Sequence, residues 1–241
     1  MTLQINTSAN EEQLLEIKHW LIDEHNKLQE GFYCNWSVIE KHFERGQLIV
    51  LNKDSRVIGF STWEIEKEIV LNIAIVEIHP DYRGKGYGEY LMQQVFNFGK
   101  DHKKAIVAKL FCAPVESKSF WKKMGFMDFP FTGYAQPPDL MYLPLIDLRS
   151  QLKADHSEES TIELWNCEPH LSDECEPQWV WSAKINNGQL IPPILAPCNR
   201  NWNIRYTQNG TIIKESKIKY FSNSNPIDKD SFLLIQELNL L

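Results

Sequence analysis

A glycine-rich, basic turn between a strand and a helix restricts most strongly how this chain can fold. Residues 79–88 read HPDYRGKGYG; the apolar run at 69–78 precedes them and an amphipathic run at 89–103 follows. The earlier run is typical of a buried strand, and the later one has the apolar spacing of a helix. The first turn of a helix leaves backbone N–H groups without partners, and the helix dipole favours negative charge there. The turn therefore predicts a phosphate or pyrophosphate site.

The glycine spacing separates this turn from two other phosphate-binding loops. A P-loop needs Ser or Thr directly after its lysine, whereas Lys85 is followed by Gly86. A dinucleotide-binding turn needs G-x-G-x-x-G, whereas Gly84, Gly86 and Gly88 are spaced two and two. The pattern that fits is R-x-x-G-x-G, formed by Arg83, Gly86 and Gly88.

This pattern, with its lead-in VEIHP at 76–80, resembles the acyl-CoA signature of the GNAT superfamily of N-acetyltransferases. A second block, SKSFWKKMGF at 117–126, is similar to the family's second signature. A capped amphipathic helix without a ligand would look the same, but the spacing of the two blocks favours the family interpretation. The resemblance covers about residues 11–147 and implies acetyl-CoA as co-substrate, without a metal. It assigns cofactor binding to Ile78, Arg83, Gly84, Lys85, Gly86, Tyr87, Gly88, Ser117, Phe120 and Trp121.

Hydrophobic periodicity predicts an α/β fold with a mixed sheet, followed by a small all-β domain. This order agrees with the GNAT-like mixed sheet flanked by helices that the resemblance implies. Helices are expected at 11–28, 36–43, 89–103 and 117–124, and strands at 47–51, 57–63, 69–78, 105–112, 126–129 and 140–146. The polar stretch 148–160 is expected to link a domain at 1–147 to a β-rich domain at 161–241. Strands are expected there at 161–165, 179–184, 204–207, 211–215, 217–221 and 232–238, with Asn209-Gly210 as a type I′ hairpin turn.

Composition narrows the partners. No run approaches 18 apolar residues and the N-terminus lacks an apolar signal core, so we expect a cytoplasmic protein without a membrane span. The net charge of −7 argues against nucleic acid as main partner and is compatible with a cationic amine. The five cysteines are expected to be free thiols. Four candidate zinc ligands, with poor spacing for a metal site, are Cys167, His170, Cys175 and Cys198.

Acetyl transfer by direct attack of an amine needs an oxyanion donor and a proton acceptor. The resemblance places the donor at the backbone N–H of Ile78. An alkylamine is mostly protonated at neutral pH, so a base or a water relay must take its proton. Glu77 and Asn72 are the candidates, Asn72 as a water-ordering group, and His79 is close in sequence. Asn72 shares strand parity with Ile78 unless a bulge intervenes.

The acid for the departing thiolate is less obvious. Many family members have a tyrosine where this chain has Trp121, whose indole N–H is no useful acid. Ser117, one helical turn earlier, and Tyr134 are the remaining candidates. A thiolate is also a tolerable leaving group without an acid, because the pKa of a thiol is about 8.5.

Two functions from different classes remain open. The first is an N-acetyltransferase that acts on a small-molecule, peptide or protein amine, with the β-rich domain covering the acceptor cleft or forming a homodimer. The second is a non-catalytic acyl-CoA-binding sensor or scaffold whose β-rich domain binds a partner. The sequence identifies neither the acceptor nor the length of the acyl chain.

Overall fold

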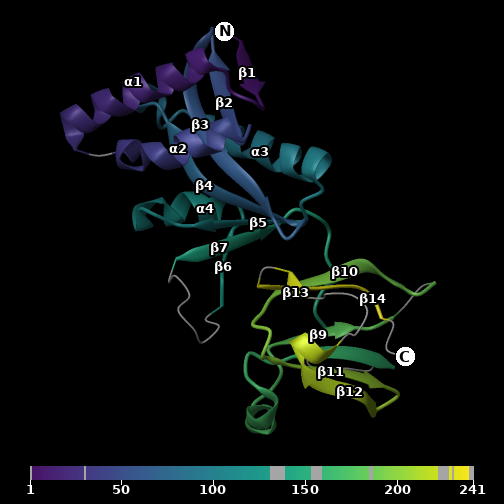
Figure 1. The fold of residues 1–241 in the computed structure, drawn as a ribbon. Coiled ribbons are helices and arrows are strands. Elements are labelled where there is room, and N and C mark those ends of the chain that lie inside the picture. Colours follow the sequence, from purple (N-terminus) through teal and green to yellow (C-terminus); the bar gives the residue numbers. More distant parts are fainter. Residues whose placement is uncertain are drawn as a thin grey trace. The chain divides into compact units, whose positions relative to one another are not determined.

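The computed structural model describes residues 2–29, 31–130, 139–152, 159–184, 187–221, 228–229 and 231–238. The chain divides into two compact units (Figure 1). Unit 1 consists of Met1–Asp128 with Asp139–Leu145, and unit 2 of Phe129–Pro138 with Ile146–Leu241. Within the described ranges, no helix is long and apolar enough to cross a membrane.

Unit 1 is a mixed sheet with helices on both faces. Its strands are β1 (Leu3–Asn6), β2 (Leu48–Lys53), β3 (Arg56–Glu66), β4 (Val70–Ile78), β5 (Val107–Phe111), β6 (Met127–Asp128) and β7 (Leu140–Pro144), in the spatial order β1-β2-β3-β4-β5-β7-β6. Its helices are α1 (Glu11–Leu28), α2 (Trp36–Glu44), α3 (Tyr87–Lys103) and α4 (Lys118–Lys123). Short 3-10 turns are η1 (Phe32–Asn35), η2 (Pro80–Tyr82) and η3 (Val115–Ser117). β4 and β5 are parallel, as expected for strands joined by a helical crossover.

Alternation along β2 divides the apolar side chains between two cores. Leu48 and Val50 pack with α1 and α2, whereas Ile49 and Leu51 pack with α3 on the opposite face. Both faces of the central strands are therefore covered by helices, and the strands read as apolar runs.

A bulge at the middle of β4 reverses which face of the sheet the later side chains of the strand point to. The register with β3 shifts between Thr62, paired with Ile75, and Trp63, paired with Ile73. Ala74 is thus the extra residue. As a result Ile73 packs in the core under α3, while Ile75, two residues on, packs in the core under α1. The bulge sets which way the last residues of β4 point.

Unit 2 has two antiparallel sheets around one core. One sheet has the order β12-β11-β8-β9 and the other β10-β14-β13. Their bounds are β8 (Ser160–Leu164), β9 (Trp179–Ser182), β10 (Gln189–Pro197), β11 (Asn203–Gln208), β12 (Thr211–Lys217), β13 (Asp228–Lys229) and β14 (Phe232–Glu237). The short helices are η4 (Pro169–Glu174) and α5 (Ile218–Phe221). Side chains from both sheets form the core, including Trp181, Ile194, Ile204 and Leu233.

The fold class is as predicted, with a few local differences. β1 and β10 were not expected, and the strand expected at 217–221 is wrong, because α5 follows directly after β12. The turn at Asn209 and Gly210 is confirmed: it joins β11 to β12, and both residues have positive φ, 49° and 74°. Arg149 and Leu152, in the stretch expected as a linker, hydrogen-bond to backbone carbonyls of unit 2.

Candidate functional site

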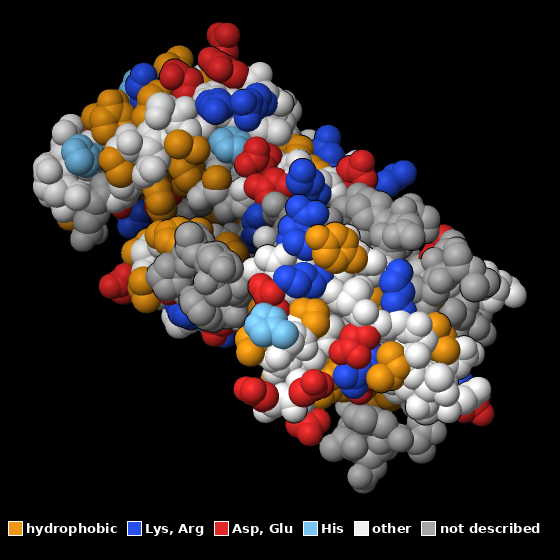
Figure 2. Space-filling view, turned by 60° about the horizontal axis from the view of Figure 1, so that its bottom comes forward, with side chains coloured by type: hydrophobic (Ala, Val, Ile, Leu, Met, Phe, Trp, Pro, Cys, Tyr) orange, Lys and Arg blue, Asp and Glu red, His pale blue; other side chains and the backbone are white. Residues whose placement is uncertain are grey.

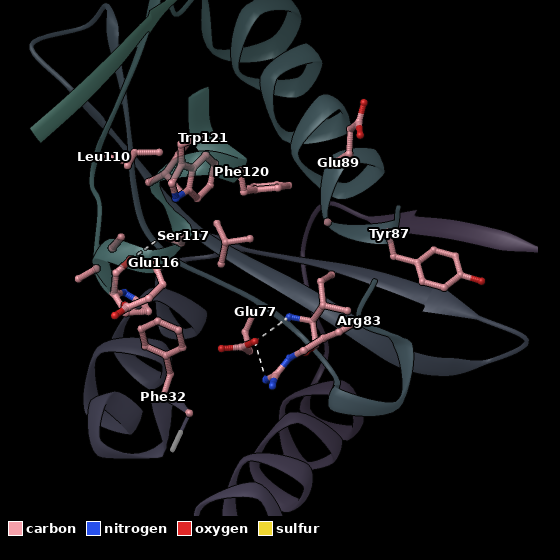
Figure 3. Close-up of a pocket in the computed structure, with 18 of the residues that line it drawn as sticks. Phe32, Glu77, Arg83, Tyr87, Glu89, Leu110, Glu116, Ser117, Phe120 and Trp121 are labelled. Carbon is pink, nitrogen blue, oxygen red and sulfur yellow. Dashed lines mark hydrogen bonds and ion pairs between the residues drawn. The ribbon is translucent and has the colours of Figure 1, made fainter. Parts of the chain in front are cut away.

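A cleft of about 1290 Å³ opens in unit 1 where β4 and β5 separate (Figure 3). The last paired residues of the two strands are Ile73 and Leu110. The cleft begins beyond this pair, and both residues line it. One side is formed by the turn after β4 and the first residues of α3, another by η3 and α4, and a third by α1 and η1. Segments far apart in the sequence therefore meet at one opening.

The last backbone N–H groups of β4 face the space between the separated strands. The N–H of His79 donates to the carbonyl of Ile58 at 2.9 Å, so this residue pair is a hydrogen-bonded one. Alternation along an antiparallel ladder then turns the N–H groups of Ile78 and Val76 away from β3, toward the cleft. The N–H of Ile78 donates to Oε1 of Glu77 at 3.1 Å.

The glycine-rich turn presents the uncapped beginning of α3. Helix α3 starts at Tyr87, two residues earlier than predicted, after Gly86 as N-cap. Gly84 and Gly86 have φ of 72° and 80°, a region that only glycine adopts without strain. No side chain caps the helix, so its first N–H groups stay available to a ligand. Gly88 approaches α4 closely: a Cβ there would lie 3.6 Å from Cζ of Phe120.

The Arg83 side chain turns away from the glycine-rich turn. Its Nη2 contacts Oε1 of Glu24 at 2.6 Å and Oε1 of Glu77 at 2.9 Å, and its Nε donates to the carbonyl of Ile78 at 2.9 Å. Because the Arg83 guanidinium is bound to these partners, only the backbone of Arg83 is left to contact a phosphate at the turn. Both carboxylates share one guanidinium nitrogen, which holds α1, the end of β4 and the turn together.

Glu77 is a buried carboxylate with one oxygen toward the cleft. Its side chain is 12% exposed, and Figure 3 shows one oxygen bound to Ile78 and Arg83 while the other points away from them. Burial raises the pKa of Glu77 above its ordinary value; Arg83 opposes this rise and Glu24 adds to it. A carboxylate with a raised pKa is a stronger proton acceptor than an ordinary one.

The side of the cleft formed by η3 and α4 combines aromatic rings with the polar side chains of Ser117, Glu116 and Lys123. Phe120 and Trp121 line it, and Trp121 packs edge-on against Phe126 with the ring centroids 5.3 Å apart. Ser117 lines it as well; its Oγ donates to the carbonyl of Pro114 at 2.8 Å and lies 3.4 Å from Sγ of Cys112. Figure 3 shows Ser117, Phe120 and Trp121 gathered opposite Glu77 and Arg83.

Two cofactor candidates on the turn have partners of their own. Nζ of Lys53, at the end of β2, donates to the hydroxyl of Tyr87 at 2.6 Å. Nζ of Lys85 donates to the carbonyl of Asp81 at 2.6 Å, and Lys85 does not line the cleft. Tyr87 does line it.

Asn72 is not brought to the cleft. Its amide donates to Oε1 of Glu64 at 3.2 Å and to Oε1 of Glu66 at 2.8 Å, on neighbouring β3. The bulge at Ala74 also separates the face of Asn72 from that of Ile78, which reverses the expected parity. Tyr134, the other distant candidate, lies outside the described residues.

The sequence patterns did not indicate the side of the cleft formed by α1 and η1, or Glu116 of η3. Glu24, Phe32, Cys34, Asn35 and Glu116 all line the cleft. A signal for Glu24 exists, because it continues the buried stripe of α1 formed by Ile17, Trp20 and Leu21. The residues of η1 and η3 carry no comparable pattern, since short turns lack periodicity.

The four candidate zinc ligands do not assemble into one site. Cys198 is buried in the core of unit 2, while Sγ of Cys167 and Sγ of Cys175 lie 3.5 Å apart. Burial raises the pKa of Cys167 to about 11, and the neighbouring thiol adds to the rise. Among the described residues, no three His, Cys, Asp or Glu side chains lie together in a group that could hold a metal ion.

On the face drawn in Figure 2, acidic, basic and apolar side chains are intermixed.

A model of a known protein family matches part of unit 1. The model described as "Acetyltransferase (GNAT) domain" matches residues 44–128, which include β2 to β6, the glycine-rich turn and α4. No curated protein matches the chain. Residues 44–128 therefore form a GNAT acetyltransferase domain, and the resemblance seen in the sequence is confirmed for them.

Several solved structures are similar to this chain. The PaiA N-acetyltransferase from Thermoplasma acidophilum, in complex with coenzyme A, is 18% identical, with a TM-score of 0.47 over 60% of this chain and 99% of that one. Ard1 from Thermoplasma volcanium is 16% identical, with a TM-score of 0.47 over 61% and 100%. N-acetylglutamate synthase from Neisseria gonorrhoeae, complexed with coenzyme A and N-acetyl-glutamate, is 12% identical, with a TM-score of 0.48 over 61% and 36%.

Proposed function

We propose that this protein transfers an acetyl group from acetyl-CoA to an amine, which attacks the thioester directly. The observation that carries the proposal is the composition of one cleft. It joins an uncapped helix N-terminus on one side to a buried carboxylate with a raised pKa on the other. The GNAT acetyltransferase domain over residues 44–128 supports the same chemistry.

The residues present fit coenzyme A. The free N–H groups at the start of α3 suit a pyrophosphate, and glycines at 84, 86 and 88 leave room for its close approach. Phe120 and Trp121 provide an apolar wall beside the strand opening. Bound acetyl-CoA would supply an acetyl group activated as a thioester.

Two neighbouring groups on β4 would act on the reactants. The N–H of Val76 faces the opening and would donate to the thioester oxygen, as would the N–H of Ile78 once it leaves Oε1 of Glu77. One such donor is typically worth about 10²–10³ in rate. Glu77, through its cleft-facing oxygen, would take a proton from the acceptor's ammonium, which leaves the neutral amine to attack the thioester carbon with its lone pair. General-base catalysis of this kind contributes about 10²–10⁴.

Charge favours a cationic acceptor. The cleft is lined by four acids, Glu24, Glu77, Glu89 and Glu116, and by two cations, Arg83 and Lys123. Arg83 is engaged by two of these acids and cannot also neutralise a carboxylate on the acceptor without losing them. A primary amine without an adjacent carboxylate suits this cleft, where Phe32 provides an aromatic face.

The leaving thiolate would be assisted by Ser117. Its hydroxyl lines the cleft one helical turn before Trp121, which stands in place of the family's tyrosine. The hydroxyl proton is donated to Pro114 in the resting protein, so it would have to turn toward the sulfur.

The test is release of free coenzyme A, measured with a thiol reagent while acetyl-CoA is incubated with a panel of mono-, di- and polyamines, amino acids and lysine peptides. We expect release to depend on the amine and to be greatest with cationic amines. Glu77→Gln should lower kcat/KM at least about 100-fold and leave the affinity for coenzyme A within about twofold, because the hydrogen bonds of Glu77 go to Ile78 and to the Arg83 side chain and not to the first N–H groups of α3.

The matched control is Asp23→Asn, which removes one exposed carboxylate from α1. It should behave as the wild type. Tight binding of acetyl-CoA without amine-dependent release would contradict the proposal and support a non-catalytic acyl-CoA-binding scaffold. Full activity of Glu77→Gln would show that another group takes the proton.

A further inference from the structure

Glu24 occupies a position where a helix of this kind normally carries an apolar residue. It continues the buried stripe of α1 that Ile17, Trp20 and Leu21 form, and its side chain is only 1% exposed. Carboxylates are almost never buried to this extent unless they are paired. The burial of Glu24 therefore calls for a reason beyond packing.

The pairing of Glu24 is incomplete. Oε1 contacts Nη2 of Arg83 at 2.6 Å, but Oε2 is buried and has no hydrogen-bond partner among the described residues. Gly31 leaves just enough room for this oxygen, since a Cβ at residue 31 would lie 2.8 Å from it. A buried carboxylate with an unpaired oxygen stabilises a fold poorly compared with an apolar side chain. The fold alone thus does not account for Glu24.

Arg83 connects Glu24 to the carboxylate at the reaction centre. The same nitrogen, Nη2, contacts both Glu24 and Glu77, and Nε is fixed on the carbonyl of Ile78. Figure 3 shows the Arg83 guanidinium reaching the Glu77 oxygen that also accepts from Ile78. The position of this guanidinium therefore depends on Glu24 as well as on Glu77.

We propose that Glu24 is a positioning residue. It holds the Arg83 guanidinium between two carboxylates, so that the positive charge is shared between Glu24 and Glu77 and Glu77 remains able to accept a proton. The proposal rests on the proposed function, in which Glu77 takes the proton of the acceptor. Glu24 itself does not touch the reacting atoms.

The charges around Glu77 support this role. Its pKa is raised first by burial; Arg83 works against the rise and the negative charge of Glu24 adds to it. The other titratable groups that line the cleft are Cys34 of η1, Tyr82 of η2, Tyr87 and Glu89 of α3, Glu116 of η3 and Lys123 of α4. Removing the charge of Glu24 leaves Arg83 to Glu77 alone, so the pKa of Glu77 should fall. Removing Arg83 should raise it.

The experiment measures the Glu77 carboxyl directly and the reaction separately. The carboxyl is titrated by NMR in full-length protein carrying 13C-labelled glutamate, in the wild type, Glu24→Gln, Arg83→Gln and Asp23→Asn, with Glu77→Gln to assign the signal. The same variants give kcat/KM as a function of pH. Glutamine at residue 24 keeps an oxygen for Arg83, and thermal melting checks that each variant is folded.

We expect opposite shifts from the two substitutions. Glu24→Gln should lower the Glu77 pKa and the acid limb of the rate profile by about one pH unit, and Arg83→Gln should raise both by about as much. Asp23→Asn should change neither. Glu24→Gln should melt no lower than the wild type, because it removes a buried charge with an unpaired oxygen.

Each other outcome has a definite meaning. An unmoved Glu77 titration in folded Glu24→Gln overturns the proposal. A titration that moves while the rate profile stays fixed removes the base role of Glu77 and overturns the proposal with it. If the wild type transfers no acetyl group, the proposed function fails, while the NMR titrations still decide whether Glu24 acts on Glu77.

Discussion

Replacing Gly88 by alanine should separate stability from cofactor binding. Gly88 lies in the first turn of α3, and its φ is not positive. An added Cβ would meet Phe120 Cζ at 3.6 Å and Ile78 Cγ1 at 3.7 Å, which are ordinary contacts without a clash. Glycine in a helix costs about 0.5–1 kcal/mol relative to alanine. Gly88→Ala should therefore stabilise the free protein and raise its Tm by roughly 1–4 °C.

The same methyl group would stand where the proposed ligand approaches the helix. Overpacking by one carbon costs about 1–3 kcal/mol, so the Kd for coenzyme A should rise about tenfold or more. Calorimetric titration with coenzyme A measures this change, and differential scanning calorimetry measures the stability. The control is Asn97→Ala, more than two turns further along α3, which should leave the Kd unchanged.

The combination of higher Tm and weaker binding is the informative result. If Gly88→Ala binds coenzyme A as tightly as the wild type, the ligand does not approach the start of α3 and the reasoning on the glycine-rich turn is refuted. If the variant is destabilised, the contact distances to Phe120 and Ile78 are wrong for the solution state.

Three further substitutions test other parts of the structure. Trp121→Tyr should not raise kcat in the coenzyme A release assay, because Trp121 is buried in the core; it should lower the free energy of unfolding by about 1 kcal/mol or more through lost packing. Ser117→Ala should lower kcat while leaving the KM for acetyl-CoA within about twofold, and an unchanged kcat would remove Ser117 from the proposed mechanism. Glu215→Gln should destabilise unit 2 by about 0.5–1 kcal/mol, since Glu215 accepts from Arg205 and Asn203 at an exposed strand position where solvent screens the charges. The pKa of Glu215 is raised by burial but lowered overall by Arg205 and Asn203, so this stability is present above about pH 4.5 and is lost as the pH falls through the lowered value; urea unfolding at several pH values checks it.

The features of unit 1 that the sequence predicted correctly were indicated by patterns within a few residues of each other. The turn at 79–88, the helix after it and the block at 117–126 were found because glycine spacing and helical periodicity are short-range signals. The hairpin turn at Asn209 and Gly210 was found for the same reason. These features depend on neighbours within a few residues.

The features that were missed depend on distant partners or break a local rule. The strand β10 contains Pro192 and Pro193, which disfavour a strand in any single-sequence interpretation, although it pairs with β14. The bulge at Ala74 has no sequence signature, yet it decides which candidates can reach the cleft. Arg83 was expected to add charge to the phosphate turn, and its partner Glu24 lies 59 residues away.

One of the three sides of the cleft comes from its own stretch of the chain, so it can be exchanged separately. Glu24 of α1 and residues of η1 supply this side, while the other two sides are built from residues between 73 and 123. A segment grafted in place of α1 and η1 could change which amine enters without altering the glycine-rich turn. Such a graft must preserve the contact between Glu24 and Arg83. A replacement segment without an acid at residue 24 would change the side of the cleft and, on the proposal above, the pKa of Glu77 at the same time.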